Sequence, residues 1–131
     1  MKAELTNSAK TITFPNDEVV IPKYISGITG GRTLDVSGIT DKYIRAGHVI
    51  ITDGAGKYKP LPTTSGAYTT VPESWTICGV LYRTVLAATP WASIMTNGQL
   101  NAVALPIPLT PVLTAFKAAC PLIELVKDEE A

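Results

Sequence analysis

The sequence contains few of the residues that bind metals or act as catalytic bases. It has one histidine, His48, and two cysteines, Cys78 and Cys120. The cysteines are not spaced as Cys-x-x-Cys, and no second histidine is present to complete a zinc site. We expect two buried thiols in a protein made in a reducing cytoplasm, with a disulfide as the alternative.

An excess of charge of either sign is also missing. Eleven Lys and Arg balance eleven Asp and Glu, so the formal net charge is zero. Proteins that bind nucleic acid or anionic membranes carry a basic excess, so neither partner is expected. No apolar run reaches the roughly 18 residues of a membrane span. The first residues lack the apolar core of a signal peptide, so no secretory leader is expected.

Catalytic and nucleotide-binding motifs are present only in fragments. Gly56-Lys57 is followed by Tyr58, and Ile51 stands where a Walker phosphate loop requires glycine. Asp53-Gly54 does not continue as a calcium-binding loop, and no Gly-x-Ser-x-Gly motif supplies a nucleophile for His48. We therefore predict no enzyme activity, no cofactor and no bound metal, and a structural role for His48.

Charge is missing altogether from residues 84–116, which contain no Asp, Glu, Lys, Arg or His. A small chain normally scatters charge over its outer faces. Depletion of charge where Trp and Met are kept is typical of the centre of an interface. We therefore predict a self-assembling structural module with Trp75, Trp91 and Met95 as oligomer-interface candidates. A neutral surface of Thr, Ser and Asn is the alternative.

The sequence does contain a series of short β-type runs. Residues 48–52 are apolar and β-branched, residues 53–56 form a glycine-rich turn, and residues 57–61 form the return strand of a predicted hairpin. Residues 76–82 form a further apolar strand. Asn97-Gly98 lies between two strand-like runs and predicts a second hairpin, with a bulge at Gly98 in one longer strand as the alternative.

One helix is expected near the end of the chain. Thr110 can cap it, Pro111 suits its first position, and Pro121 stops it. Residues 110–119 are therefore predicted to be helical, and residues 122–126 to form a final strand. The expected fold class is mainly β with one short C-terminal helix.

An amino-terminal arm is expected before the domain of residues 23–131. Residues 1–22 contain two short β-type runs, at 11–14 and 19–21, that have no hairpin partner among their neighbours. An unpaired strand is best satisfied by adding to the edge of another sheet. The arm is therefore predicted to be extended.

Five segments resemble, in their order, the succession found in head proteins of tailed phages. They are residues 33–37 (TLDVS), 44–50 (IRAGHVI), 53–60 (DGAGKYKP), 79–81 (GVL) and 92–101 (ASIMTNGQLN). The chain is similar in this respect to the lambda-type head decoration proteins and to the head fibre proteins of phages and prophages of gut Bacteroidetes. The resemblance covers residues 33 to 126 and rests on the order of the segments.

The resemblance implies a small β-barrel or β-tulip-like domain in a structural virion protein. Such proteins lie on the outside of the capsid, commonly as trimers, and stabilise or decorate the head. The implied partners are the major capsid protein, further copies of the chain, and a head fibre. In lambda-type members an amino-terminal arm adds to the sheet of the capsid protein. The matching capsid-binding candidates in this chain are Thr11, Ile12, Thr13 and Phe14.

The alternative function is a carbohydrate-binding module displayed on the phage head. Trp75 or Trp91 would then be a platform on which a sugar ring stacks. A tryptophan in a sugar site stays accessible to solvent in the assembled trimer, whereas a tryptophan in an interface is buried.

Overall fold

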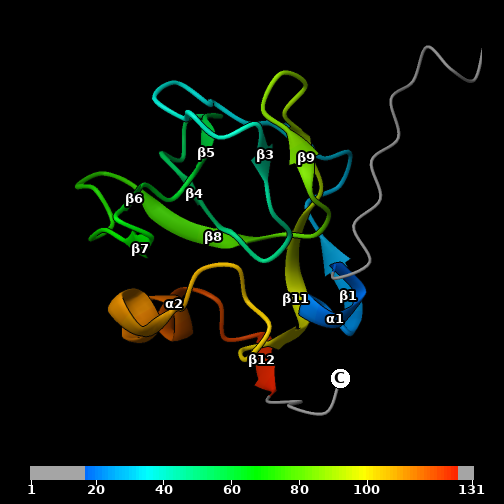
Figure 1. The fold of residues 1–131 in the computed structure, drawn as a ribbon. Coiled ribbons are helices and arrows are strands. Elements are labelled where there is room, and N and C mark those ends of the chain that lie inside the picture. The colour runs from blue at the N-terminus through cyan, green and yellow to red at the C-terminus, as the bar shows by residue number, and fades with distance from the viewer. Residues whose placement is uncertain (1–16, 127–131) are drawn as a thin grey trace, which may run out of the picture.

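The computed structural model of the protein describes residues 17–126 (Figure 1). Strands dominate this range and form one six-stranded sheet and three two-stranded sheets. The main sheet has the order β1 (Lys23–Gly27), β11 (Ile94–Asn101), β8 (Thr76–Leu81), β4 (Val49–Thr52) and β5 (Tyr58–Pro60), and β12 (Ile123–Val126) also pairs with β11. Strands β11 and β12 run parallel, and the other neighbours run antiparallel. The predicted mainly β class is confirmed.

The remaining elements are short. The small pairs are β2 (Arg32–Thr33) with β10 (Trp91–Ala92), β3 (Tyr43–Ile44) with β9 (Val85–Leu86), and β6 (Thr63–Thr64) with β7 (Ala67–Tyr68). The helices are α1 (Asp17–Val20), the 3-10 turn η1 (Thr110–Val112) and α2 (Leu113–Ala119). Within residues 17–126 the main sheet is open, with β1 and β5 at the ends of its path. Each helix of this range is too short or too polar to cross a bilayer.

Hydrophobic clusters cover both faces of the main sheet. Successive side chains of a strand point to opposite faces. In β4, Val49 and Ile51 belong to the first cluster, whereas Ile50 belongs to the second. The first cluster includes Phe116 of α2 and the second includes Ile44 of β3. Figure 1 accordingly shows α2 on one side of β8 and β3 with β9 on the other.

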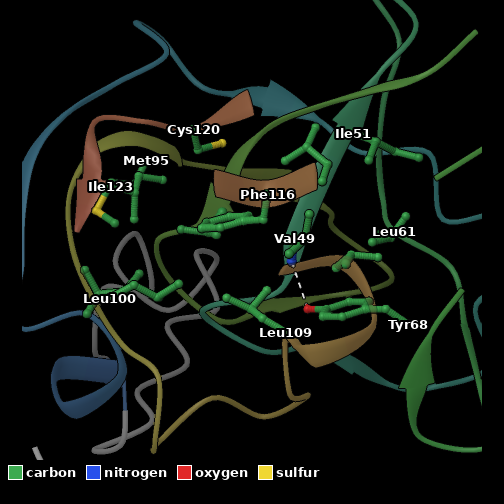
Figure 2. Packing of buried hydrophobic residues seen from close by; sticks show 14 of the residues in the cluster. Val49, Ile51, Leu61, Tyr68, Met95, Leu100, Leu109, Phe116, Cys120 and Ile123 are labelled. Carbon is green, nitrogen blue, oxygen red and sulfur yellow. Dashed lines mark hydrogen bonds between the residues drawn. The ribbon is translucent and has the colours of Figure 1, made fainter. Parts of the chain in front are cut away.

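The first cluster is the larger of the two and is organised around Phe116. This ring is fully buried, and Figure 2 shows it among the other side chains of the cluster. Burying an aromatic side chain of this size contributes on the order of 2–3 kcal/mol. The short helix α2 is therefore held mainly by the packing of Phe116 against the sheet.

Burial on both faces explains part of the missing charge in residues 84–116. Strand β11 lies between β1 on one side and β8 and β12 on the other. Its residues Ile94, Met95 and Leu100 are at most 1% exposed. A strand covered on both faces has no outer face on which to place charge.

The predicted helix over residues 110–119 is confirmed. It begins as η1 and continues as α2, with Pro111 in its first turn. The predicted cap at Thr110 is wrong, because Leu109 occupies the N-cap position of η1 and no side chain caps it. Strand β12 follows Pro121 as predicted.

The two hairpin predictions have different outcomes. The hairpin of β4 and β5 is confirmed. The hairpin at Asn97-Gly98 is wrong, because both residues lie inside the eight-residue strand β11. The one longer strand of the alternative is confirmed, but the register of β11 against β1 shifts on either side of the Asn97–Ser26 pair and does not place a bulge at Gly98 itself. Partners from distant parts of the chain thus override a local turn signal.

The strand predicted for residues 19–21 is also wrong. Asp17–Val20 form the single helical turn α1, and Val20 and Ile21 are buried in the first cluster. The packing is close: Gly47 has φ of +89°, and a Cβ there would lie 2.6 Å from Cγ1 of Val20. Residues 17–22 therefore belong to the domain. The capsid-binding candidates Thr11, Ile12, Thr13 and Phe14 lie outside the described residues, and their role stays a prediction.

Candidate functional site

A groove of about 900 Å³ lies beside strand β1 and is the candidate functional site. Residues 24–33, which run from β1 through a turn into β2, line one part of it, and residues 91–93 line the rest. The pairing of Trp91 with Thr33 between β10 and β2 brings these two distant segments together. We call this feature the Trp91 groove.

Exposed hydrophobic side chains gather in this groove. Among the described residues, five large hydrophobic side chains are exposed, and three of these line the groove. Trp91 is 76% exposed, Ile25 is 54% exposed and Tyr24 is 42% exposed. Tryptophan is highly buried on average, and a gathering of exposed apolar side chains marks a binding surface. The Trp91 groove is therefore a candidate for recognition rather than a by-product of folding.

Ring contacts hold Tyr24 in place. Its ring centroid lies 4.5 Å from that of Tyr82, with 36° between the planes. The guanidinium of Arg83 lies 4.7 Å from the centroid of the Tyr82 ring. Both contacts are in the range of favourable aromatic and cation–π interactions. The groove therefore presents a tyrosine whose position is set by neighbouring side chains.

Arg32 braces the turn between β1 and β2, which lines part of the groove. Its Nη1 donates hydrogen bonds to the carbonyl oxygens of Thr29, at 3.1 Å, and Gly31, at 2.6 Å. Gly31 has φ of +70°, and a Cβ on it would lie 2.8 Å from the carbonyl oxygen of Ala92. The turn thus approaches β10 closely because glycine stands there.

A second cavity, of about 430 Å³, lies beside His48. The ring is 8% exposed, and its Nε2 lies 2.9 Å from the carbonyl oxygen of Leu61. Because a carbonyl only accepts hydrogen bonds, Nε2 carries the proton. The ring also makes an edge-on contact with Tyr68, at 5.2 Å between centroids. Burial lowers the pKa of His48, so the ring is neutral near pH 7. These contacts fit the structural role predicted for His48.

The Gly-Lys pair of the sequence belongs to the turn between β4 and β5. Oδ1 of Asp53 accepts hydrogen bonds from the backbone N–H of Ala55, at 2.8 Å, and of Lys57, at 3.2 Å. The bond from Ala55 is the main cause that lowers the pKa of the Asp53 carboxyl. The aspartate therefore shapes a tight turn and occupies two of its backbone N–H donors.

The three predicted interface residues differ in how far they are buried. Met95 is fully buried in the first cluster, so its assignment to an interface is wrong: it packs inside one chain. Trp75 is half-buried against the same cluster, with the Lys59 ammonium 4.3 Å from its ring centroid. Of the three, Trp91 alone stands exposed in a groove. The interface role of Trp75 and Trp91 stays a prediction.

Sequence reasoning missed Tyr24 and Ile25 as site residues. They are adjacent in a five-residue strand, and they lie near Trp91 only because β2 pairs with β10. No local signal marks two adjacent apolar strand residues as exposed, because a strand of this sheet such as β4 buries such neighbours on its two faces.

The two cysteines are free, and neither lies in a reactive setting. Sγ of Cys78 donates a hydrogen bond to the carbonyl oxygen of Ile50 at 3.3 Å. Burial raises the pKa of Cys78 to about 12 and that of Cys120 to about 11. Both thiols are therefore protonated at physiological pH.

No protein-family model matches the chain, and no curated protein or solved structure matches it significantly. The resemblance to phage head proteins therefore stays a prediction from the order of its segments.

Proposed function

We propose that this chain is a structural protein of a tailed-phage head. It assembles as a trimer on the outer surface of the capsid and binds the major capsid protein, and it performs no catalysis. It is made in the host cytoplasm and carried on the virion. Two observations support this proposal: the arrangement of the five resembling segments in the fold, and an uncharged stretch of surface.

Four of the five resembling segments come together in the main sheet, and the fifth, residues 33–37, begins in the separate strand β2. Residues 44–50 lead into β4, residues 53–60 contain the turn and β5, residues 79–81 end β8, and residues 92–101 lead through β11. Strands β5, β4, β8 and β11 are consecutive neighbours in this sheet. Four of the motifs thus lie in adjacent strands of one sheet, which supports treating them as a single resemblance.

The observation that carries the proposal is the uncharged surface segment, residues 102–115. Burial of β11 does not explain the lack of charge here, because much of this segment faces solvent. Val103 is 51% exposed, and Pro106, Pro108 and Thr114 are also exposed. A surface without charge on a chain of zero net charge has little repulsion to keep copies apart. Such a composition suits contact between copies.

A trimer at the junction of capsomers would stabilise the head by a simple mechanism. Contacts that exist only in the assembled state stabilise that state by mass action. Each copy would bury surface against its neighbours and against the capsid protein. The junction would then resist the outward pressure of the packaged DNA.

A binding experiment with capsids tests this proposal. The purified chain is mixed with capsids of the phage that encodes it, stripped of this protein, and the capsids are pelleted. We expect saturable co-sedimentation of the chain. A chain that stays in the supernatant at every concentration would contradict the capsid role.

A pair of matched variants tests the uncharged surface segment. Val103→Asp adds a carboxylate to the proposed contact, and Thr64→Asp adds one to the exposed hairpin of β6 and β7. We expect Val103→Asp to weaken self-association at least about tenfold in sedimentation velocity, because a buried unpaired charge is costly. Thr64→Asp should associate as the wild type does. Equal association of both variants would exclude residues 102–115 from the contact.

A further inference from the structure

We propose that the Trp91 groove binds a neutral saccharide, with Trp91 as the platform on which a sugar ring stacks. The inference goes beyond the capsid role and does not depend on it, because one chain builds the whole groove. It rests on three features: the exposed aromatic side chains, the polar and nearly uncharged lining, and the irregular edge of the sheet.

The aromatic side chains suit the apolar face of a sugar ring. A pyranose presents C–H groups on its faces and hydroxyl groups around its rim. Tryptophan offers a large, rigid surface that stacks against such C–H groups. Trp91 is 76% exposed and Tyr24 is 42% exposed in the same groove, with Tyr24 positioned by Tyr82. A saccharide of two or more rings can therefore contact two aromatic side chains.

The rest of the lining suits the hydroxyl groups. Ser26, Thr29 and Ser93 line the groove, and each hydroxyl donates and accepts hydrogen bonds. Strand β1 pairs with β11 on one side and, among the described residues, has no strand on the other. The backbone N–H and C=O groups on its outer edge would present both donors and acceptors to a bound ligand. A sugar hydroxyl can both donate to and accept from such groups, and it does not need the regular register that a pairing strand needs.

The charge of the lining indicates a neutral ligand. Among the described residues, Arg32 is the only charged one in the lining, and Nη1 of this side chain already donates to two carbonyl oxygens of its own turn. None of the described lining residues carries a carboxylate, so they offer a cationic ligand no counter-charge. A polyanionic ligand would require several cations rather than one. The neutral lining is complementary to an uncharged, hydroxyl-rich ligand.

The geometry of β1 disfavours a protein strand as the occupant. Its register against β11 shifts twice within five residues. Such irregularities twist an edge away from regular pairing and protect it against strand addition. The site is also small for an interface: thirteen residues line it, whereas a stable interface takes roughly 20–30 residues from each side. Its volume of about 900 Å³ lies within the range of roughly 300–1,000 Å³ that is typical of small-molecule sites.

Calorimetry with defined sugars tests the proposal on the full chain. The probes are neutral hexasaccharides: maltohexaose, cellohexaose, mannohexaose, xylohexaose and chitohexaose. We expect at least one of them to bind saturably, with Kd below about 1 mM. The variant Trp75→Phe keeps Trp91 as its only tryptophan. In a fluorescence titration of this variant, addition of the sugar that binds should change the tryptophan emission.

Variants of Trp91 assign the binding to the groove. Trp91→Ala should weaken binding of that sugar at least about tenfold, as for an aromatic contact at the centre of a site. Trp91→Phe keeps a ring and should retain part of the affinity. Leu122→Ser removes an exposed hydrophobic side chain outside the groove and should bind as the wild type does. Equal urea midpoints would show that all variants are folded.

Three results would overturn the proposal. One is that no hexasaccharide binds with Kd below about 10 mM. A second is that Trp91→Ala binds the sugar as tightly as the wild type. A third is that Trp91→Ala converts an oligomer into monomers, because Trp91 would then be buried between copies as an interface residue. Capsid co-sedimentation is measured separately from sugar binding. Either proposal can therefore be contradicted while the other holds.

Discussion

The backbone N–H of Val49 donates a 3.0 Å hydrogen bond to the hydroxyl of Tyr68 (Figure 2). Val49 begins strand β4 of the main sheet, and Tyr68 ends the small hairpin of β6 and β7. Both residues are at most 4% exposed. Burial raises the pKa of Tyr68, so the hydroxyl stays protonated. This bond joins the small hairpin to the main sheet.

Replacing Tyr68 with Phe should destabilise the fold. The Val49 N–H would lose its acceptor in a buried place, which costs about 1–3 kcal/mol. Urea unfolding measures the free energy of unfolding. Tyr24→Phe, at an exposed tyrosine, is the control and should change stability by less than about 0.5 kcal/mol. Equal unfolding midpoints for the two variants would show that the bond contributes nothing.

His48 should make stability depend on pH. Burial lowers its pKa in the folded chain below the unfolded value of about 6.5. As the pH falls through that unfolded value, the unfolded chain takes up the proton first. The free energy of unfolding therefore decreases below about pH 7, by at most about 1.4 kcal/mol per pH unit, and levels off once the folded ring is protonated.

The variant His48→Gln isolates this contribution. Glutamine keeps a side-chain N–H that can donate to the Leu61 carbonyl but does not titrate. The wild type and the variant are unfolded in urea at intervals between pH 5 and 7.5. The stability of the wild type relative to the variant should fall toward low pH. A difference that is constant across this range would rule out a lowered pKa for His48.

The two thiols should be unreactive in the folded protein. With pKa values of about 12 for Cys78 and about 11 for Cys120, less than about one thiol in a thousand is ionised at pH 8. Labelling with a thiol reagent should be slow in buffer and complete in about 8 M urea. Replacing both cysteines with Ala should leave capsid binding intact. Rapid labelling of either folded thiol, or a loss of binding by the folded double variant, would contradict a structural role.

Deleting residues 1–15 should separate folding from attachment. The cut precedes α1, so Val20 and Ile21 keep their places in the first cluster. We expect a folded oligomer that binds capsids poorly, because Thr11, Ile12, Thr13 and Phe14 are the predicted capsid-binding residues. Ordering such a segment costs about 1–2 kcal/mol per residue, so its pairing and the burial of Phe14 must outweigh that cost. Capsid binding as tight as that of the full chain would show that attachment lies in the domain.

Local signals predicted the elements whose partners are close in the sequence. The Asp53 turn is formed by hydrogen bonds to residues two and four positions later, so its hairpin could be predicted. The helix over residues 110–119 has its start and stop marked by Pro111 and Pro121. Asn97-Gly98 led to the wrong prediction of a hairpin, because the strands that pair with β11 come from residues 23–27, 80–81 and 123–126.

The candidate site was predicted only in part for the same reason. Trp91 was singled out by its type, but its groove is built by the chain around Tyr24 and Arg32, which the β2–β10 pairing brings to it. Met95 was assigned to an interface because it lies in a charge-free segment. Lack of charge, however, arises both in a core covered on two sides and in a contact surface. Only the three-dimensional arrangement separates buried Met95 from exposed Val103.

The mass of the protein in solution tests the central claim most directly. One chain has a mass of 13.9 kDa, so a trimer has three times that mass, about 42 kDa. Multi-angle light scattering on a size-exclusion column should give this value for the wild type and keep it on dilution to micromolar concentration. A stable mass of about 14 kDa, that of one chain, would contradict the proposal that this protein acts by assembling with copies of itself.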